Sequence, residues 1–102
     1  MIQGKGGCVY IITNVRHTVL YTGVTSDLTS RMIQHKEKLF PKSFSAKYNC
    51  DKLVYFKSFF NIEEAIIEEK KIKGGSRQDK INRILSTNPN WDDLFETEIS
   101  KW

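Results

Sequence analysis

The 102-residue sequence predicts a small α/β domain of the α+β type, in which a three-stranded antiparallel sheet is flanked by helices. Two observations support this fold class. Three short runs are rich in β-branched and aromatic residues, and the segments between and after them carry apolar residues at helical spacing. The expected order of elements is β-β-α-β-α-α.

The first two strands are expected at residues 8–12 (CVYII) and 19–24 (VLYTGV), separated by the polar residues 13–18. Two such runs joined by a polar connection are typical of an antiparallel hairpin. The third strand is expected at residues 52–59 (KLVYFKSF).

A first helix is expected over residues 25–39, where Ser26 is the predicted N-cap. Leu28, Met32 and Leu39 form its apolar side. Residues 40–51 (FPKSFSAKYNCD) are expected to form a basic, aromatic loop.

A second helix is expected from the cap Asn61 to Gly74-Gly75, which should stop it. A third begins at Ser76, which forms a capping box with Asp79. Its expected inward-facing residues are Ile81, Ile84 and Leu85.

The length indicates a single domain over residues 1–102. We expect a flexible leader at 1–7 and a short acidic helix or tail at 90–102. Within that tail, a closing helix docked on the core is expected from the i, i+3, i+4 spacing of Trp91, Leu94 and Phe95.

Several features point to a cytoplasmic protein. No stretch approaches the roughly 20 apolar residues of a membrane span, and residues 1–7 have no apolar core of a secretory signal. Cys8 and Cys50 form no metal-type pair, so two reduced thiols are expected.

The charge is unevenly distributed along the chain. The net charge is +4, but residues 1–89 hold 15 basic and 8 acidic residues, a net charge of +7. A basic body of this kind favours a polyanionic partner, most simply nucleic acid. A merely solubilising surface is the alternative.

Glu69 is the residue that does not fit its surroundings. At about 100° per residue, the apolar positions of the second helix form one stripe, with Glu69 between Ile66 and Ile72. A carboxylate facing a core must be paired, protonated or bound to a cation. We therefore expect either a buried ion pair, a stripe edge that reaches water, or a metal ligand. The stripe consists of Ile62, Ala65, Ile66 and Ile72.

Four other polar groups complete a candidate site. Arg31 and His35 lie four residues apart on one face of the first helix, and Tyr10 and Tyr21 lie on the two strands of the hairpin. Each group alone has an ordinary explanation, a solvated helix face or strand packing. Together with Glu69 they are the components of metal-assisted phosphodiester hydrolysis.

These residues resemble the GIY-YIG nuclease family, in particular its short stand-alone bacterial members. Residues 8–10 (CVY) and 21–23 (YTG) resemble the two halves of the family motif. Residues 25–36 are similar to the segment with the functional arginine and histidine, and residues 64–74 to the segment with the metal-binding glutamate. The resemblance covers roughly residues 8–95.

The resemblance implies a DNA endonuclease with one Mg²⁺ or Mn²⁺ ion. The implied catalytic residues are Tyr10, Tyr21, Arg31, His35 and Glu69, and Glu69 is also the implied metal ligand. The family includes excision-repair nucleases, so DNA repair is one expected setting.

Three further residues are expected to assist this site. Gly23 should let the backbone approach the substrate or turn tightly into the helix. Lys73 and Arg77, which flank the Gly74-Gly75 turn, are the expected nucleic-acid contacts. Two alternatives remain: a catalytically inactive nucleic-acid-binding module with the same fold, and an adaptor that binds an acidic protein.

Overall fold

The computed structural model describes residues 6–99. Its sheet places β1 (Gly7–Thr13) between β2 (Leu20–Thr25) and β3 (Lys52–Phe59), and both pairings are antiparallel. The predicted three-stranded antiparallel sheet with flanking helices is confirmed.

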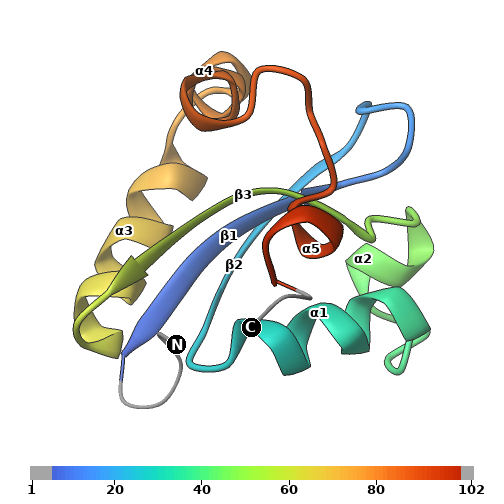
Figure 1. Cartoon of the computed structure of the whole chain (residues 1–102), viewed down its shortest axis with the longest axis horizontal. Coiled ribbons are helices and arrows are strands. Elements are labelled where there is room, and N and C mark those ends of the chain that lie inside the picture. Colours follow the sequence, from blue (N-terminus) through green and yellow to red (C-terminus); the bar gives the residue numbers. More distant parts are fainter. Residues whose placement is uncertain (1–5, 100–102) are drawn as a thin grey trace.

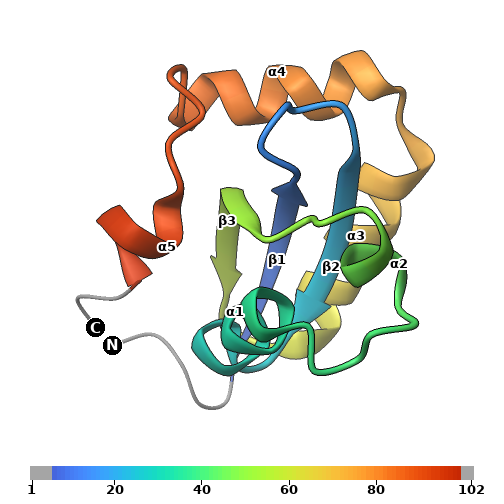
Figure 2. The same cartoon turned by 90° about the vertical axis from the view of Figure 1, so that its right-hand side faces the viewer.

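Helices cover both faces of the sheet. They are α1 (Leu28–Glu37), α2 (Phe44–Lys47), α3 (Ile62–Gly74), α4 (Arg77–Thr87) and α5 (Leu94–Thr97). Figure 1 shows α1 and α5 on one side of the sheet and α3 on the other. In Figure 2, α4 crosses the end of the sheet from which the β1–β2 loop emerges.

Alternation along β1 divides the core between these two faces. Tyr10 shares a buried cluster with Leu28 and Met32 of α1, whereas Ile11 clusters with Ile72 of α3 on the opposite face. Every residue of β1 is buried, because the strand is central in the sheet and covered on both faces.

The start and end of the first helix differ from the prediction. The N-cap is Asp27, not Ser26, since the Asp27 carboxylate accepts hydrogen bonds from the first turn. The helix ends before Lys38, whose positive φ turns the chain away. Leu39 therefore lies outside the helix and is exposed.

The predicted loop 40–51 contains a helical turn, α2. The Ser43 side chain caps it by accepting a hydrogen bond from the backbone N–H of Ala46. We expected a loop because the segment is basic and aromatic, and this composition concealed the capping role of Ser43.

The caps of the later helices are as predicted, with Asn61 opening α3 and Ser76 forming a capping box at α4. Two apolar positions predicted to face the core, Ile66 and Leu85, are instead exposed. Each lies at the edge of its apolar stripe.

Trp91 does not belong to the closing helix. It precedes α5 with a positive φ and stacks on His17 at a centroid distance of 4.5 Å, on the α4 side of the sheet. Leu94 and Phe95 pack against the core on the opposite face, so the chain crosses from one face to the other between Trp91 and Leu94.

Gly7, which the predicted flexible leader 1–7 included, instead opens β1 and pairs with Phe59. The remainder of that leader, 1–5, and the tail residues 100–102 lie outside the described residues. Within 6–99, no helix combines the length and apolar character needed to cross a bilayer.

Candidate active site

Tyr10 occupies the centre of the sheet opposite Gly23 of β2. A Cβ atom on Gly23 would overlap the ring and hydroxyl of Tyr10, so only glycine leaves space for the phenol. Gly23 lies within strand β2 and not in the expected turn into the helix, and it makes room for Tyr10.

The Tyr10 hydroxyl is held by two groups of α1. It lies 3.0 Å from His35 Nε2, and Arg31 Nη1 donates to it over 3.5 Å. The other ring nitrogen of His35, Nδ1, lies 2.8 Å from Ser45 Oγ on α2. Phenol, imidazole and serine hydroxyl thus form one hydrogen-bonded line.

Burial controls the protonation of this line. It raises the pKa of Tyr10 to about 12, although Arg31 acts in the opposite direction. Burial also lowers the pKa of His35 to about 4, and the Arg31 charge adds to that shift. At neutral pH the phenol therefore keeps its proton and the imidazole is uncharged.

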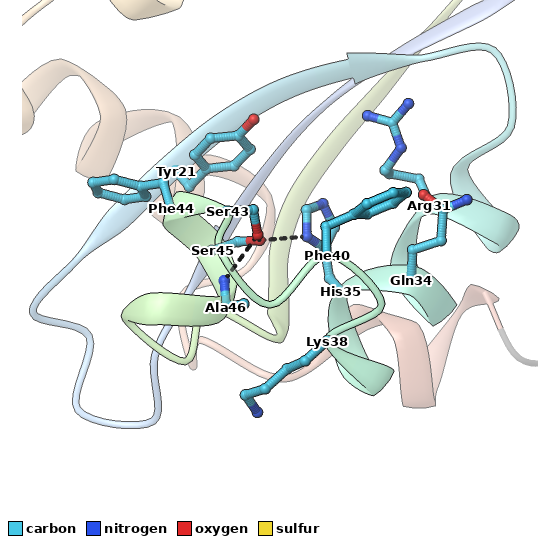
Figure 3. Close-up of a pocket in the computed structure, with 10 residues that line it drawn as sticks. All are labelled: Tyr21, Arg31, Gln34, His35, Lys38, Phe40, Ser43, Phe44, Ser45 and Ala46. Carbon is cyan, nitrogen blue, oxygen red and sulfur yellow. Dashed lines mark hydrogen bonds between the residues drawn. The ribbon is translucent and has the colours of Figure 1, made fainter.

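Tyr21 lies on the same side of the sheet as Tyr10. Its ring meets His35 edge-on at 6.0 Å and stacks on Phe44 at 5.9 Å between centroids. Figure 3 shows these rings around a hollow of about 390 Å³, with Arg31 at one end. Arg31 and His35 line this hollow, and the buried Tyr10 hydroxyl lies behind them through its contacts with both.

Glu69 is buried on α3, with 8% of its surface exposed. Its Oε2 lies 2.6 Å from Nζ of Lys73, one helical turn further on. The ion pair anticipated as the simpler explanation is thus present. The Glu69 charge also contributes, more weakly than burial, to the raised pKa of Tyr10.

The donor set fits one hard divalent ion. Mg²⁺ is commonly held by one or two carboxylates together with waters and substrate phosphates. Glu69 supplies one such carboxylate, and no cluster of three or more His, Cys, Asp or Glu side chains suited to a metal occurs among residues 6–99. Lys73 is 52% exposed, so its ammonium can leave the carboxylate to a metal ion.

Lys73 and Arg77 lie in different surroundings. Lys73 lines a second hollow of about 310 Å³ together with Tyr21 and Phe44. Arg77 instead donates from Nη2 to the backbone carbonyl of His17 at 3.0 Å, at the end of the β1–β2 loop. The tertiary structure therefore places Lys73 beside Tyr21, whereas Arg77 is hydrogen-bonded to the β1–β2 loop.

Comparison with known proteins agrees with this geometry. A family model of the GIY-YIG catalytic domain matches residues 6–82, more than half of the chain. The chain belongs to the GIY-YIG family. Proteins of the GIY-YIG family are usually endonucleases and generally depend on divalent metal ions.

A UPF0213 protein of Bacillus halodurans, known from a solution NMR structure, shares the GIY-YIG-like fold. The two chains superpose with a TM-score of 0.56 at 22% identity, over 91% of this chain and 97% of that one. A search of curated proteins finds no match.

Two contributors to this GIY-YIG site were not identified from the sequence. Ser45 positions the imidazole of His35, and Phe44 packs on Tyr21. Both lie in the segment interpreted as a loop. The signal that the sequence offered was the pair of serines at positions 43 and 45, within the aromatic and basic segment.

Proposed function

We propose that this protein is an endonuclease that hydrolyses DNA phosphodiester bonds with one divalent metal ion, Mg²⁺ or Mn²⁺. The observation that supports this most directly is the Tyr10 hydroxyl, held between His35 and Arg31 in a fold that also buries the carboxylate of Glu69. Hydrolysis needs a proton acceptor for water, a positive clamp for phosphate and a cation, and these residues supply them.

Tyr10 accepts the proton of the attacking water. A phenol with a pKa of about 12 is a poor base by itself, so it passes its own hydrogen to His35 Nε2 as it takes up the new one. Ser45 supports this direction of transfer when it accepts a hydrogen bond from Nδ1–H, since the lone pair of neutral imidazole is then at Nε2. The lowered pKa of His35 opposes proton uptake, so the transfer requires the negative charge of the bound phosphodiester, which raises that pKa.

Arg31 binds a non-bridging phosphate oxygen, for which its planar guanidinium is well suited. Glu69 holds the divalent ion, which when bound supplies positive charge to stabilise the phosphorus centre and the leaving 3′ oxygen. Tyr21 closes the site beside His35 and aligns the imidazole through its ring edge.

The partner class follows from charge. The excess of basic residues in 1–89 favours a polyanion, and Lys73 beside Tyr21 is positioned to contact a backbone phosphate. Arg77 is a second proposed contact, beside the β1–β2 loop.

One observation favours a second function, a nucleic-acid-binding module without activity. The Glu69–Lys73 ion pair neutralises the carboxylate that a metal ion would need. If no metal ion displaces Lys73, the basic surface still binds nucleic acid but no hydrolysis follows.

Cleavage of labelled single-stranded, duplex and branched DNA with Mg²⁺ or Mn²⁺ distinguishes the two functions. The wild type is compared with Glu69→Ala and with the matched control Glu63→Ala, an exposed glutamate on the same helix. Cutting that requires metal and disappears only in Glu69→Ala supports the nuclease. Salt-dependent binding by a folded wild type that cuts nothing supports the binding module.

A further inference from the structure

Residues 38–49, here called the aromatic arm, run from the end of α1 through α2. The arm contains three lysines and no acidic residue. Three of its rings are exposed: Phe40 at 62%, Phe44 at 48% and Tyr48 at 40%. Among the described residues, only Phe60 is a comparably exposed aromatic outside the arm.

The rings of the arm are arranged as a series. Tyr21 stacks on Phe44 at an interplanar angle of 26°, and Phe44 in turn contacts Tyr48 at a centroid distance of 4.7 Å. Lys47 lies over the Tyr48 ring at 5.4 Å. In Figure 3, Phe44 lies beside Tyr21 at one side of the hollow, and Phe40 lies by His35 at the other.

A group of exposed rings around one hollow indicates a binding site, whereas a single exposed ring such as Phe60 does not. Contiguous apolar surface exposed to water is unfavourable, and in soluble proteins such patches mark binding sites. Flat apolar rings beside lysines, with no carboxylate in the arm, are complementary to a ligand with flat rings and negative charges. Nucleotides have both features, and aromatic rings with lysines are the usual means of binding single strands.

We propose that the aromatic arm stacks unpaired bases next to the scissile phosphate, so that nucleic acid with a single-stranded segment is the preferred substrate. In a duplex the two faces of each base are already covered by its neighbours, and the rings of the arm have nothing to stack on. This inference rests on the proposed function, because it takes Arg31 and the Tyr10–His35 pair as the position of the phosphate.

The second hollow can receive the neighbouring part of the bound nucleic-acid strand. It lies on the other side of the Tyr21–Phe44 pair and includes the cations Lys73 and Lys80. A strand that stacks one base against Phe44 would thus have Arg31 on one side for the reacting phosphate and Lys73 on the other for a neighbouring one.

Binding without metal tests the arm separately from cleavage. A short oligothymidylate with one 2-aminopurine is titrated with protein in EDTA, and the same sequence is titrated as a duplex. Stacking on a protein ring quenches the 2-aminopurine. The variants are Phe44→Leu and Tyr48→Leu, which keep apolar bulk without a ring, and the control is Phe60→Leu, at the far end of β3 from α2. Thermal unfolding verifies that each variant is folded.

We expect the single strand to bind more tightly than the duplex and to be quenched. Phe44→Leu should weaken single-strand binding roughly tenfold, with loss of quenching, as removal of one base–aromatic stack does. Phe60→Leu should leave both unchanged. Tyr48→Leu supplies the same test if Phe44→Leu does not fold.

Equal binding of duplex and single strand, or equal effects of Phe44→Leu and Phe60→Leu, would overturn the inference. Metal-dependent cutting of duplex alone would also overturn it while the nuclease function stands. Quenched, ring-dependent binding without cutting of any substrate supports the arm and removes the nuclease function.

Discussion

Lys73 Nζ lies 2.6 Å from Glu69 Oε2, so an exposed ammonium covers a buried carboxylate at the edge of the site. The two side chains come from successive turns of α3, and only the carboxylate is held in place by burial. The lysine thus competes with any metal ion for Glu69.

Replacing Lys73 with glutamine removes this competitor. We expect Lys73→Gln to bind Mn²⁺ up to about fivefold more tightly, because an ion pair with an exposed partner contributes at most ~1 kcal/mol. Isothermal titration calorimetry measures the change, and Lys70→Gln, an exposed lysine on the same helix, is the control. A Glu69→Gln variant that binds Mn²⁺ as tightly as the wild type would show that Glu69 is not the ligand.

Gly23 and Tyr10 form a second coupled pair. Gly23→Ala places a methyl group on the phenol, and we expect a loss of about 1–3 kcal/mol in the free energy of unfolding. Gly74→Ala is the matched control: nothing lies within 4 Å of its added Cβ, so it should be neutral or stabilising by up to ~1 kcal/mol. Urea denaturation measures both.

The same pair predicts non-additivity. In a Tyr10→Ala background the phenol is absent, so Gly23→Ala should be much less costly. An equal loss in the free energy of unfolding in both backgrounds would show that the added methyl group clashes with another part of β2 and not with Tyr10.

The lowered pKa of His35 makes stability depend on pH. The folded pKa is about 4 and the unfolded value is about 6.5, so between these values the unfolded chain binds more protons. The free energy of unfolding is therefore greatest above pH 6.5 and decreases as the pH falls toward 4. Because His35 is only partly buried, we expect a loss on the order of 1–2 kcal/mol.

His35→Gln should flatten this part of the stability profile, measured by urea unfolding at several pH values. The pKa of His17 is also lowered, by slight burial and by Lys52, so His17→Gln is the control and should keep most of the slope. A wild-type slope retained in His35→Gln would assign the effect to other groups.

Two threonines of β2 give opposite predictions. Among the described residues, Thr22 Oγ1 is buried without a hydrogen-bond partner, whereas Thr25 Oγ1 both donates to and accepts from the backbone of Asp27. Thr22→Val should therefore stabilise the protein by about 1 kcal/mol and Thr25→Val should destabilise it by a similar amount. Thermal unfolding measures both, and a drop in Tm for Thr22→Val would indicate that a water or ligand satisfies its hydroxyl.

Much of the fold was predictable because its signals are local. Runs of β-branched and aromatic residues predicted the strands, and the capping residues Asn61 and Ser76 predicted where α3 and α4 begin. The predicted cap Ser26 was wrong: the adjacent Asp27 caps α1, because it is the Asp27 side chain that reaches the first turn.

The sequence by itself determined the residue types of the site and the burial of Glu69, because helical periodicity depends on neighbouring positions only. Only the tertiary structure decided which groups meet. The docking of α1 on the sheet sets the Tyr10–His35 distance, and α2 brings Ser45 to the imidazole. These contacts join residues far apart in the chain, and their distances depend on strand register and helix packing, which no local pattern encodes.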